Sequence, residues 1–301
     1  MRGARIDDVR DFRARTGPLL LADELRHSVP LGVLATIERD PDRFTEHHLW
    51  LVKDGGEVVA CALRTPPFHL LAVGHPAGFD ELVATVLADG IPVPGVNGFR
   101  PEVEEFAERW ARATGSSART AMSMRMYSTD AVVPPRAVPG RMRAAFDADH
   151  ELLGAWARSF AVETGLPEGP EQLARSLAAQ IGADPGIVVW EVDGAPVTLA
   201  GGRESSPGIA RVGPVYTPPE HRRRGYATSL VAAWTSELLR RGMRRCALFT
   251  DLANPTSNSI YQAVGYRPYA DAAVIDFIET NGRGDGEDRV LRRRAPDGRH
   301  P

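Results

Sequence analysis

Residues 210–242 read ARVGPVYTPPEHRRRGYATSLVAAWTSELLRRG, and this stretch decides the fold of the chain. A strand-like segment leads into a loop that contains Arg222, Arg223, Arg224 and Gly225, and an amphipathic helix follows. The first turn of a helix carries N–H groups without intrahelical partners, and the aligned peptide dipoles add positive charge there. A glycine before that turn lets the backbone approach a ligand closely. The pattern predicts a phosphate-binding loop, with a solvated basic loop before an ordinary helix as the alternative.

The composition is typical of a globular chain with two medium-sized domains. The chain has 301 residues, of which 43% are hydrophobic and 25% charged, and its net charge is -3. This small net charge does not indicate a nucleic-acid or membrane partner. Lys53 is the only lysine, so the chain cannot carry a Walker A phosphate loop.

The two cysteines and eight histidines follow no disulfide or metal-binding pattern. Cys61 and Cys246 each lie within a predicted strand, where we expect small, buried, apolar side chains. Such sparse cysteines fit a reducing compartment, and the N-terminal stretch MRGARIDDVRDF lacks the apolar segment of a signal peptide. We therefore expect a cytoplasmic monomer or homodimer that binds no metal.

A proline-rich segment divides the chain. The sequence VPPRAVPG at 133–140 interrupts the periodic segments, and proline and glycine at this density favour an extended linker. We place a first domain at 1–135 and a second at 136–279. Residues 280–301 are charged and rich in glycine and proline, which predicts a flexible tail.

The second domain is predicted to have the order α-α-β-β-β-α-β-α-β. Apolar residues from Met142 to Phe160 recur at helical spacing, and 172–181 predict a second helix. Asp193-Gly194 between IVVWEV and PVTLAGGRE is typical of a hairpin turn. The third strand IARVGPVYT precedes the basic loop and its helix. The strand RCALFTDL, a short helix and the strand AAVIDFI complete the domain.

The first domain shows a fainter version of the same order. Residues 19–39 predict a helix interrupted at Pro30, and HLWLVKDGGEVVACAL predicts a strand, a tight turn and a strand. HLLAVG predicts a third strand, and VPGVNG is a turn-rich edge segment between helices predicted at 79–87 and 101–114. The partly alternating RTAMSMRMYS closes the domain as a strand. We interpret the chain as two copies of one fold.

The loop after the third strand distinguishes the two copies. In the first domain it reads GHPAG at 74–78, with no arginine. Its proline removes one amide donor. The second domain is therefore predicted to hold a phosphate ligand, and the first is not.

Over residues 140–279 the chain resembles the GNAT superfamily of acyl-CoA-dependent N-acyltransferases. RRRGYA at 222–227 matches the family's pyrophosphate-loop pattern Arg/Gln-x-x-Gly-x-Gly/Ala. NPTSNSIY at 254–261 matches its pattern of an asparagine after a strand and a tyrosine on the next helix. The resemblance implies an α/β (mixed α+β) chain of two tandem GNAT-like domains, each a mixed, mostly antiparallel sheet flanked by helices. The first domain is then a degenerate copy.

The resemblance also implies acetyl-CoA as cosubstrate and a small-molecule amine as acceptor. The backbone at 215–217 is expected to pair with the pantetheine arm and to polarise the thioester carbonyl, while amides of 223–228 surround the pyrophosphate. The expected cofactor contacts are Val215, Tyr216, Thr217, Arg222, Arg223, Arg224, Gly225, Tyr226, Ala227, Thr228, Asn254 and Asn258.

Tyr261 is the expected general acid of this reaction. A phenol with a pKa of about 10 is protonated at neutral pH and can donate to a leaving thiolate. Its alternative role is that of a half-buried aromatic packed beneath the loop. Glu204, acting through a water molecule, is the candidate general base. Glu191, Asp251, or an ordered water with a path to solvent are the alternatives.

We therefore expect an N-acetyltransferase that moves the acetyl group of acetyl-CoA directly to a primary amine of a small metabolite or amino-acid-like acceptor. A non-catalytic acyl-CoA-binding regulatory module is one alternative, and transfer of another acyl group such as succinyl is a second. The first domain is expected to act as a scaffold, either as one wall of the acceptor groove or by continuing the sheet of the second domain.

Overall fold

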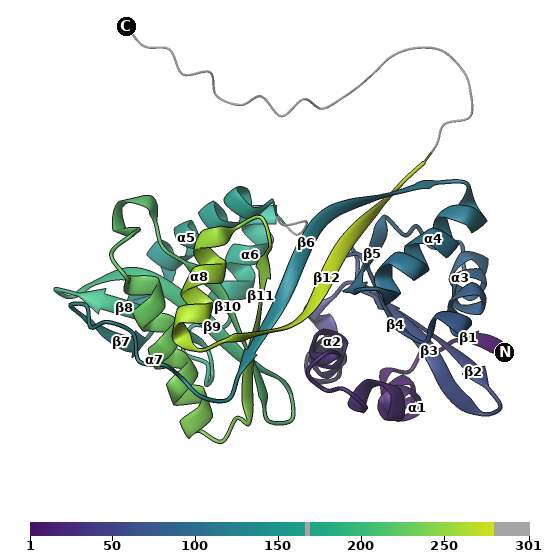
Figure 1. The fold of residues 1–301 in the computed structure, drawn as a ribbon, viewed down its shortest axis with the longest axis horizontal. Coiled ribbons are helices and arrows are strands. Elements are labelled where there is room, and N and C mark those ends of the chain that lie inside the picture. The colour runs from purple at the N-terminus through teal and green to yellow at the C-terminus, as the bar shows by residue number, and fades with distance from the viewer. Residues whose placement is uncertain (166–168, 280–301) are drawn as a thin grey trace, which may run out of the picture.

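A computed structural model describes residues 1–165 and 169–279 of the chain, so the predicted tail at 280–301 lies outside the described residues. Within them the strands form one sheet of twelve, in the order β1-β2-β3-β4-β5-β12-β6-β11-β10-β9-β8-β7. Helices cover the sheet along both halves of the molecule (Figure 1). The neighbouring pairs of this described sheet are antiparallel except β4–β5 and β10–β11. The predicted class of mixed, mostly antiparallel sheets flanked by helices is confirmed.

The same series of elements occurs twice along the chain. The first half consists of β1 (Arg2–Arg5), α1 (Val9–Leu21), α2 (Ser28–Arg39), β2 (His48–Asp54), β3 (Glu57–Arg64), β4 (Leu70–Gly74), α3 (Phe79–Ala88), β5 (Gly95–Phe99), α4 (Glu102–Thr114) and β6 (Ser117–Thr129). The second consists of β7 (Arg141–Ala144), α5 (His150–Thr164), α6 (Gly169–Ala178), β8 (Ile187–Val192), β9 (Ala195–Ser206), β10 (Ile209–Tyr216), α7 (Tyr226–Arg240), β11 (Arg245–Asp251), α8 (Pro255–Val264) and β12 (Arg267–Ile278).

Each half begins with a short strand that the sequence analysis did not predict. The strand β7 pairs with β8, with Met142 opposite Trp190. The prediction that Met142 belongs to the first helix of the second domain is therefore wrong. The four residues of β7 alternate between charged and small or apolar side chains, but four residues are too few to distinguish the period of a strand from that of a helix.

Two further predictions for the first half are wrong. Pro30 does not interrupt a helix, because it lies in the first turn of α2, where a missing N–H breaks no intrahelical bond. The segment around β5 is not at an edge, since β5 lies between β4 and β12. Gly95 makes this central position possible. A Cβ there would lie 2.2 Å from the carbonyl oxygen of Ile275 on β12.

The two halves exchange their last strands. β6 of the first half pairs with β11 of the second, from Cys246 opposite Thr129 to Asp251 opposite Met124. β12 of the second half pairs with β5 of the first, and β6 and β12 pair with each other at the centre of the sheet. Figure 1 shows these two strands as long ribbons that run between the halves. The sheet of each half is therefore completed by a strand from the other half.

The core has two layers because alternate residues of each strand face opposite sides of the sheet. In the second half one face packs Ala200, Val212 and their neighbours under α7 and α8. The other face packs Val189 and Leu199 under α5 and α6. The first half repeats this division, with α3 and α4 on one face and α1 and α2 on the other.

Candidate donor and acceptor site

The strands β10 and β11 diverge in the middle of the second half. Their parallel pairing begins at Ile209 opposite Arg245 and ends at Arg211 opposite Ala247. On its other side β10 pairs with β9, with a register shift between Val212 and Val215. A bulge of this kind bends a strand and increases its twist. Among the residues that the structure describes, the last part of β10, where Val215 and Tyr216 lie, therefore has no strand partner on the side of β11.

The loop at 222–225 connects the end of β10 to α7. Gly225 has φ of 81° and Arg223 has φ of 62°, so both residues take the left-handed conformation. A Cβ on Gly225 would lie 3.1 Å from Cγ1 of Val138 in the linker between the halves. Glycine is therefore favoured by its backbone angle and by this close approach. A left-handed arginine is strained, and such residues concentrate at functional sites.

Arg222 is held by the protein itself. Its Nη2 donates to both carboxylate oxygens of Glu163 on α5, at 2.9 and 2.8 Å, and its Nε donates to the Thr217 carbonyl at 2.8 Å. The hydroxyl of Tyr216 donates to the same carboxylate at 3.0 Å. Arg222 thus neutralises Glu163 and ties the loop to the end of β10.

The other predicted loop residues remain available to a ligand. Arg223 and Arg224 are exposed, and within residues 1–165 and 169–279 neither forms an ion pair. Ala227 and Thr228 are half-buried in the first turn of α7, and Tyr226 is buried. N–H groups of a first helical turn have no intrahelical acceptor. These amides and the two exposed arginines form the positive end of α7.

The two predicted asparagines hold the start of α8. Oδ1 of Asn254 accepts from the Ser257 N–H at 3.1 Å and caps the helix. Nδ2 of Asn258 donates to the carbonyls of Asp251 and Asn254, at 3.0 and 2.7 Å. Its Oδ1 accepts from the Tyr127 hydroxyl at 3.0 Å, on the exchanged strand β6. Contact of these amides with the donor stays a prediction.

Tyr261 lies in α8 and is buried against the core beneath α7. Burial raises the pKa of its phenol to about 12. Its ring meets the edge of Tyr266 at 6.1 Å between centroids. The Tyr266 hydroxyl is bonded to Thr235 at 2.8 Å, whereas the Tyr261 hydroxyl has no hydrogen-bond partner within the described part of the chain. Tyr261 is therefore a protonated phenol whose hydroxyl is not committed elsewhere.

Each candidate general base has a local structural partner. The Glu204 carboxylate accepts from the Gly208 N–H of its own hairpin at 2.9 Å. Glu191 is bonded to Arg143, which lowers the pKa of its carboxyl group. Asp251 accepts from the N–H of Ala253 at 2.8 Å. These hydrogen bonds hold the three carboxylates in place, and their catalytic role stays a prediction.

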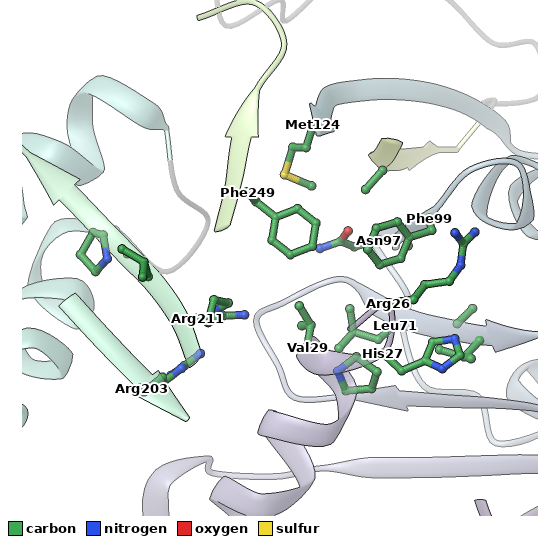
Figure 2. Close-up of a pocket in the computed structure, with 18 of the residues that line it drawn as sticks. Arg26, His27, Val29, Leu71, Asn97, Phe99, Met124, Arg203, Arg211 and Phe249 are labelled. Atoms are coloured by element: carbon green, nitrogen blue, oxygen red, sulfur yellow. The ribbon is translucent and has the colours of Figure 1, made fainter. Parts of the chain in front are cut away.

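A cavity of about 640 Å³ lies between the two halves of the molecule. Figure 2 shows residues of the first half on one side and strands of the second half on the other. The first half contributes α2, β4 and β5, and the second contributes α6, β10 and β11. Among the apolar residues that line it are Val29, Leu71, Phe99, Met124, Leu177 and Phe249. The first half is therefore one wall of this cavity and also continues the sheet.

Two arginines on the other wall were not predicted from the sequence. Arg203 on β9 and Arg211 on β10 lie directly opposite each other in the antiparallel register and line the cavity. Within the residues that the structure describes, neither guanidinium has an ion pair or a hydrogen bond. Arg203 and burial lower the pKa of Arg211 to about 9. An arginine inside each of two adjacent apolar strands was the signal available in the sequence.

His27 also lines the cavity, from the turn before α2. Its Nδ1 lies 3.0 Å from the carbonyl oxygen of Leu20. A carbonyl can only accept, so Nδ1 carries the proton. Burial lowers the pKa of His27, which favours the neutral ring with an unprotonated Nε2.

Over the described ranges, no helix is long and apolar enough to cross a membrane. In the same part of the chain, no three His, Cys, Asp or Glu side chains gather as a possible metal site. Cys61 and Cys246 are both free and buried, as their positions in strands predict.

Comparisons with known proteins connect this geometry to a family. Residues 188–274 match the family model described as FR47-like protein. The chain is 32% identical over 131 residues to aminoglycoside N(6')-acetyltransferase type 1 of Serratia marcescens, covering 39% of this chain and 87% of that protein.

Solved structures share the whole architecture at low identity. A tandem GNAT protein from the clavulanic acid biosynthesis pathway matches with a TM-score of 0.60 and 16% identity, over 94% of this chain and 100% of that one. A GNAT-family acetyltransferase from Colwellia psychrerythraea matches with a TM-score of 0.61 and 12% identity, over 93% of this chain and 100% of that one. These matches support a tandem fold along nearly the full chain.

Proposed function

Since this chain is an acetyltransferase of the GNAT superfamily, we propose that it transfers the acetyl group of acetyl-CoA directly to a primary amine of a small, amino-acid-like metabolite. The observation that carries the proposal is the divergence of β10 and β11 beside the positive end of α7. An unpaired strand edge can receive an extended amide-containing arm. A helix N-terminus with exposed arginines can receive a pyrophosphate.

The residues at the end of β10 and the start of α7 fit a bound acetyl-CoA. We propose that the pantetheine arm pairs with the free edge of β10 at Val215 and Tyr216, and that the pyrophosphate lies on the amides that follow Gly225. The left-handed φ of Gly225 and its tight approach to Val138 support this assignment, because both favour glycine at the position where the backbone would meet the pyrophosphate. The thioester carbonyl then lies near the bulge, where a backbone N–H of β10 stabilises the developing oxyanion.

The chemistry is a single displacement at the thioester carbon. The unprotonated amine attacks, a C–N bond forms, and the C–S bond breaks to release the coenzyme A thiolate. We propose that Tyr261 gives its hydroxyl proton to this thiolate and regains a proton from solvent. Its uncommitted hydroxyl supports this role, and the phenol is protonated at neutral pH.

The proton released by the amine needs a separate acceptor. We propose that it leaves through water in the cavity between the halves. The hydrogen bond between Glu204 and Gly208 favours this route over direct use of Glu204. A Glu204→Gln variant distinguishes the two: a base role predicts a fall in kcat of about 10²-fold or more, and the water route predicts little change.

The remaining assignments are also proposals. We place the domains at 1–135 and 136–279, with one donor site per chain in the second. A reducing cytoplasm suits the two buried free thiols, Cys61 and Cys246.

The direct test combines binding with turnover. Purified protein is titrated with acetyl-CoA by calorimetry and then assayed for thiol release across a panel of primary amines, with mass detection of the acetylated product. We expect binding, and thiol release with a subset of small amines. Binding without release on any amine would instead support a non-catalytic acyl-CoA-binding module.

A further inference from the structure

Two arginines that have no ionic partner within the described ranges lie opposite each other on the strands β9 and β10. Arg203 and Arg211 are register partners, so their side chains leave the same face of the sheet with Cβ atoms about 5 Å apart. Like charges directly opposite each other destabilise a sheet. The positive charge of Arg203 lowers the pKa of Arg211, because it disfavours the protonated form of the neighbouring guanidinium group. At neutral pH both guanidinium groups remain charged.

The surroundings do not relieve this repulsion. Burial and the positive charges of Arg43 and Arg39 lower the pKa of Arg203. Glu102 is the acidic residue among the described cavity-lining side chains, and it is bonded to Arg26 at 2.6 Å. Arg203 is exposed and Arg211 is half-buried, and both line the cavity. Two like charges held opposite each other without an acidic partner in the described residues repel, so a ligand that supplies the opposite charge would relieve this repulsion.

The pair lies close to the proposed reaction centre. Arg211 is the last residue of β10 that pairs with β11, and Gly213 and Pro214 at the bulge line the same cavity. Two residues of strand span about 7 Å. An anionic group on the arginines and an amine at the bulge could therefore belong to one small molecule.

We propose that Arg203 and Arg211 bind the carboxylate of the acceptor, so that the substrates are primary amines that also carry a carboxylate and an apolar body. The inference rests on the proposed acetyl transfer. Guanidinium groups match carboxylates through paired, charge-assisted hydrogen bonds. The side chains of Leu71, Phe99 and Phe249 provide apolar contacts for the rest of the molecule. An aminoglycoside, which carries several protonated amines, is disfavoured by the same arginines.

The carboxylate could also come from the donor, as in succinyl-CoA, and the assay must separate these sources. One arm uses acetyl-CoA with phenylalanine, phenylalaninamide and phenethylamine, which differ in the carboxylate. A second arm uses succinyl-CoA with phenethylamine. We expect kcat/KM to be at least about 10-fold higher for phenylalanine than for its amide, and succinyl-CoA not to rescue phenethylamine.

The variants Arg203→Gln and Arg211→Gln test the residues. Each should lower kcat/KM for phenylalanine by about 10- to 100-fold and bring the ratio of phenylalanine to phenylalaninamide towards one. Arg112→Gln is the matched control, because Arg112 is exposed on α4 outside the cavity. The affinity for acetyl-CoA should be the same in all of these proteins.

A stability measurement separates ligand binding from a structural role. Because the two charges repel each other, either Gln variant should match or exceed the wild type in Tm, whereas loss of a structural arginine lowers Tm. Phenylacetate, a carboxylate without an amine, should raise the Tm of the wild type and of Arg112→Gln, and should not raise that of the cavity variants.

The outcomes distinguish the two proposals. Phenylacetate stabilisation that depends on Arg203 and Arg211, without turnover of any amine, would support the carboxylate site and contradict acetyl transfer. Turnover with equal preference for phenylalanine, its amide and phenethylamine would support acetyl transfer and overturn the carboxylate site. Faster use of succinyl-CoA that depends on Arg211 would also overturn it, by moving the carboxylate to the donor.

Discussion

The loops at 74–78 and 222–225 occupy the same place in the two halves of the chain. Each follows the fourth strand of its half, β4 or β10, and each leads into the next helix, α3 or α7. Each of those strands is antiparallel to the strand before it and parallel to the strand after the helix. The fold therefore presents two similar positions for an anion at a helix N-terminus.

The first loop has used its donors internally. The His75 Nδ1 accepts from the Ala77 N–H at 3.2 Å, and the Gly78 N–H donates to the His75 carbonyl at 2.9 Å. Pro76 has no N–H to offer. The second loop instead has two left-handed residues and three exposed arginines, of which Arg223 and Arg224 form no ion pair within the described residues. We propose that these few loop residues decide whether an anion binds, while both halves keep the same fold.

The first half contributes to the site by position rather than by a loop. It supplies one wall of the cavity, and its last strand β6 lies between β11 and β12. Separating the two halves is therefore the strongest test of what the first half contributes to the second.

Removal of residues 1–135 should have the largest effect. The remaining chain would lose β6 and leave β11 and β12 with unpaired edges, and exposed edges of this length promote aggregation. We expect insoluble protein, measured as the soluble fraction after expression. Coexpression of 1–135 with 136–301 is the control and should restore a soluble pair. A soluble, active fragment 136–301 would overturn this account.

The next largest effect is expected for Tyr261→Phe. Loss of the acid should lower kcat by about 10²- to 10⁴-fold while acetyl-CoA binding is retained. The helix α4 of the first half has no tyrosine, so this test targets a group that only the second copy has. Tyr266→Phe is the matched control. It removes a hydrogen bond to Thr235 and should lower stability by about 1 kcal/mol without changing kcat strongly.

The pH profile sharpens the same prediction. The pKa of Tyr261 is raised to about 12, so its acid form is present at all lower pH values. Turnover should therefore rise with pH as the acceptor amine loses its proton, with no loss from Tyr261 until pH approaches 12. Unchanged turnover in Tyr261→Phe would falsify the acid role and leave Tyr261 as a packing residue.

These features differ in how far the sequence could predict them. The paired motifs at 222–227 and 254–261 predicted the family, and the repeated order of predicted elements predicted the tandem fold, because both depend on local patterns. The strand exchange could not be predicted, since β6 has the same alternation whichever neighbour it pairs with. The arginine pair was missed for a similar reason. Arg203 and Arg211 meet only through the register of β9 and β10.

A smaller effect is expected for Gly225→Ala. An alanine at this position is strained at a φ of 81°, and its Cβ would lie 3.1 Å from Val138. The substitution should therefore distort the loop and weaken acetyl-CoA binding by about 10-fold or more. Gly90→Ala is the control, because Gly90 has φ of 65° and no atom within 4 Å of the added Cβ. It should lower stability by about 1 kcal/mol and leave the Kd for acetyl-CoA unchanged. Equal Kd values in the two variants would contradict a donor role for this loop.

The smallest effects should come from the individual arginines, and their order tests how the loop works. Arg223→Ala and Arg224→Ala should each weaken acetyl-CoA binding by several-fold and reduce its dependence on salt, because both charges are exposed and unpaired in the described structure. Arg222→Ala should change Kd less, since its charge is already neutralised by Glu163, and should instead lower stability by about 0.5 kcal/mol. Calorimetry at two salt concentrations measures both quantities. If Arg222→Ala had the largest effect on Kd, its ion pair with Glu163 would have to open when the donor binds, and the first loop would differ from the second in mobility as well as in charge.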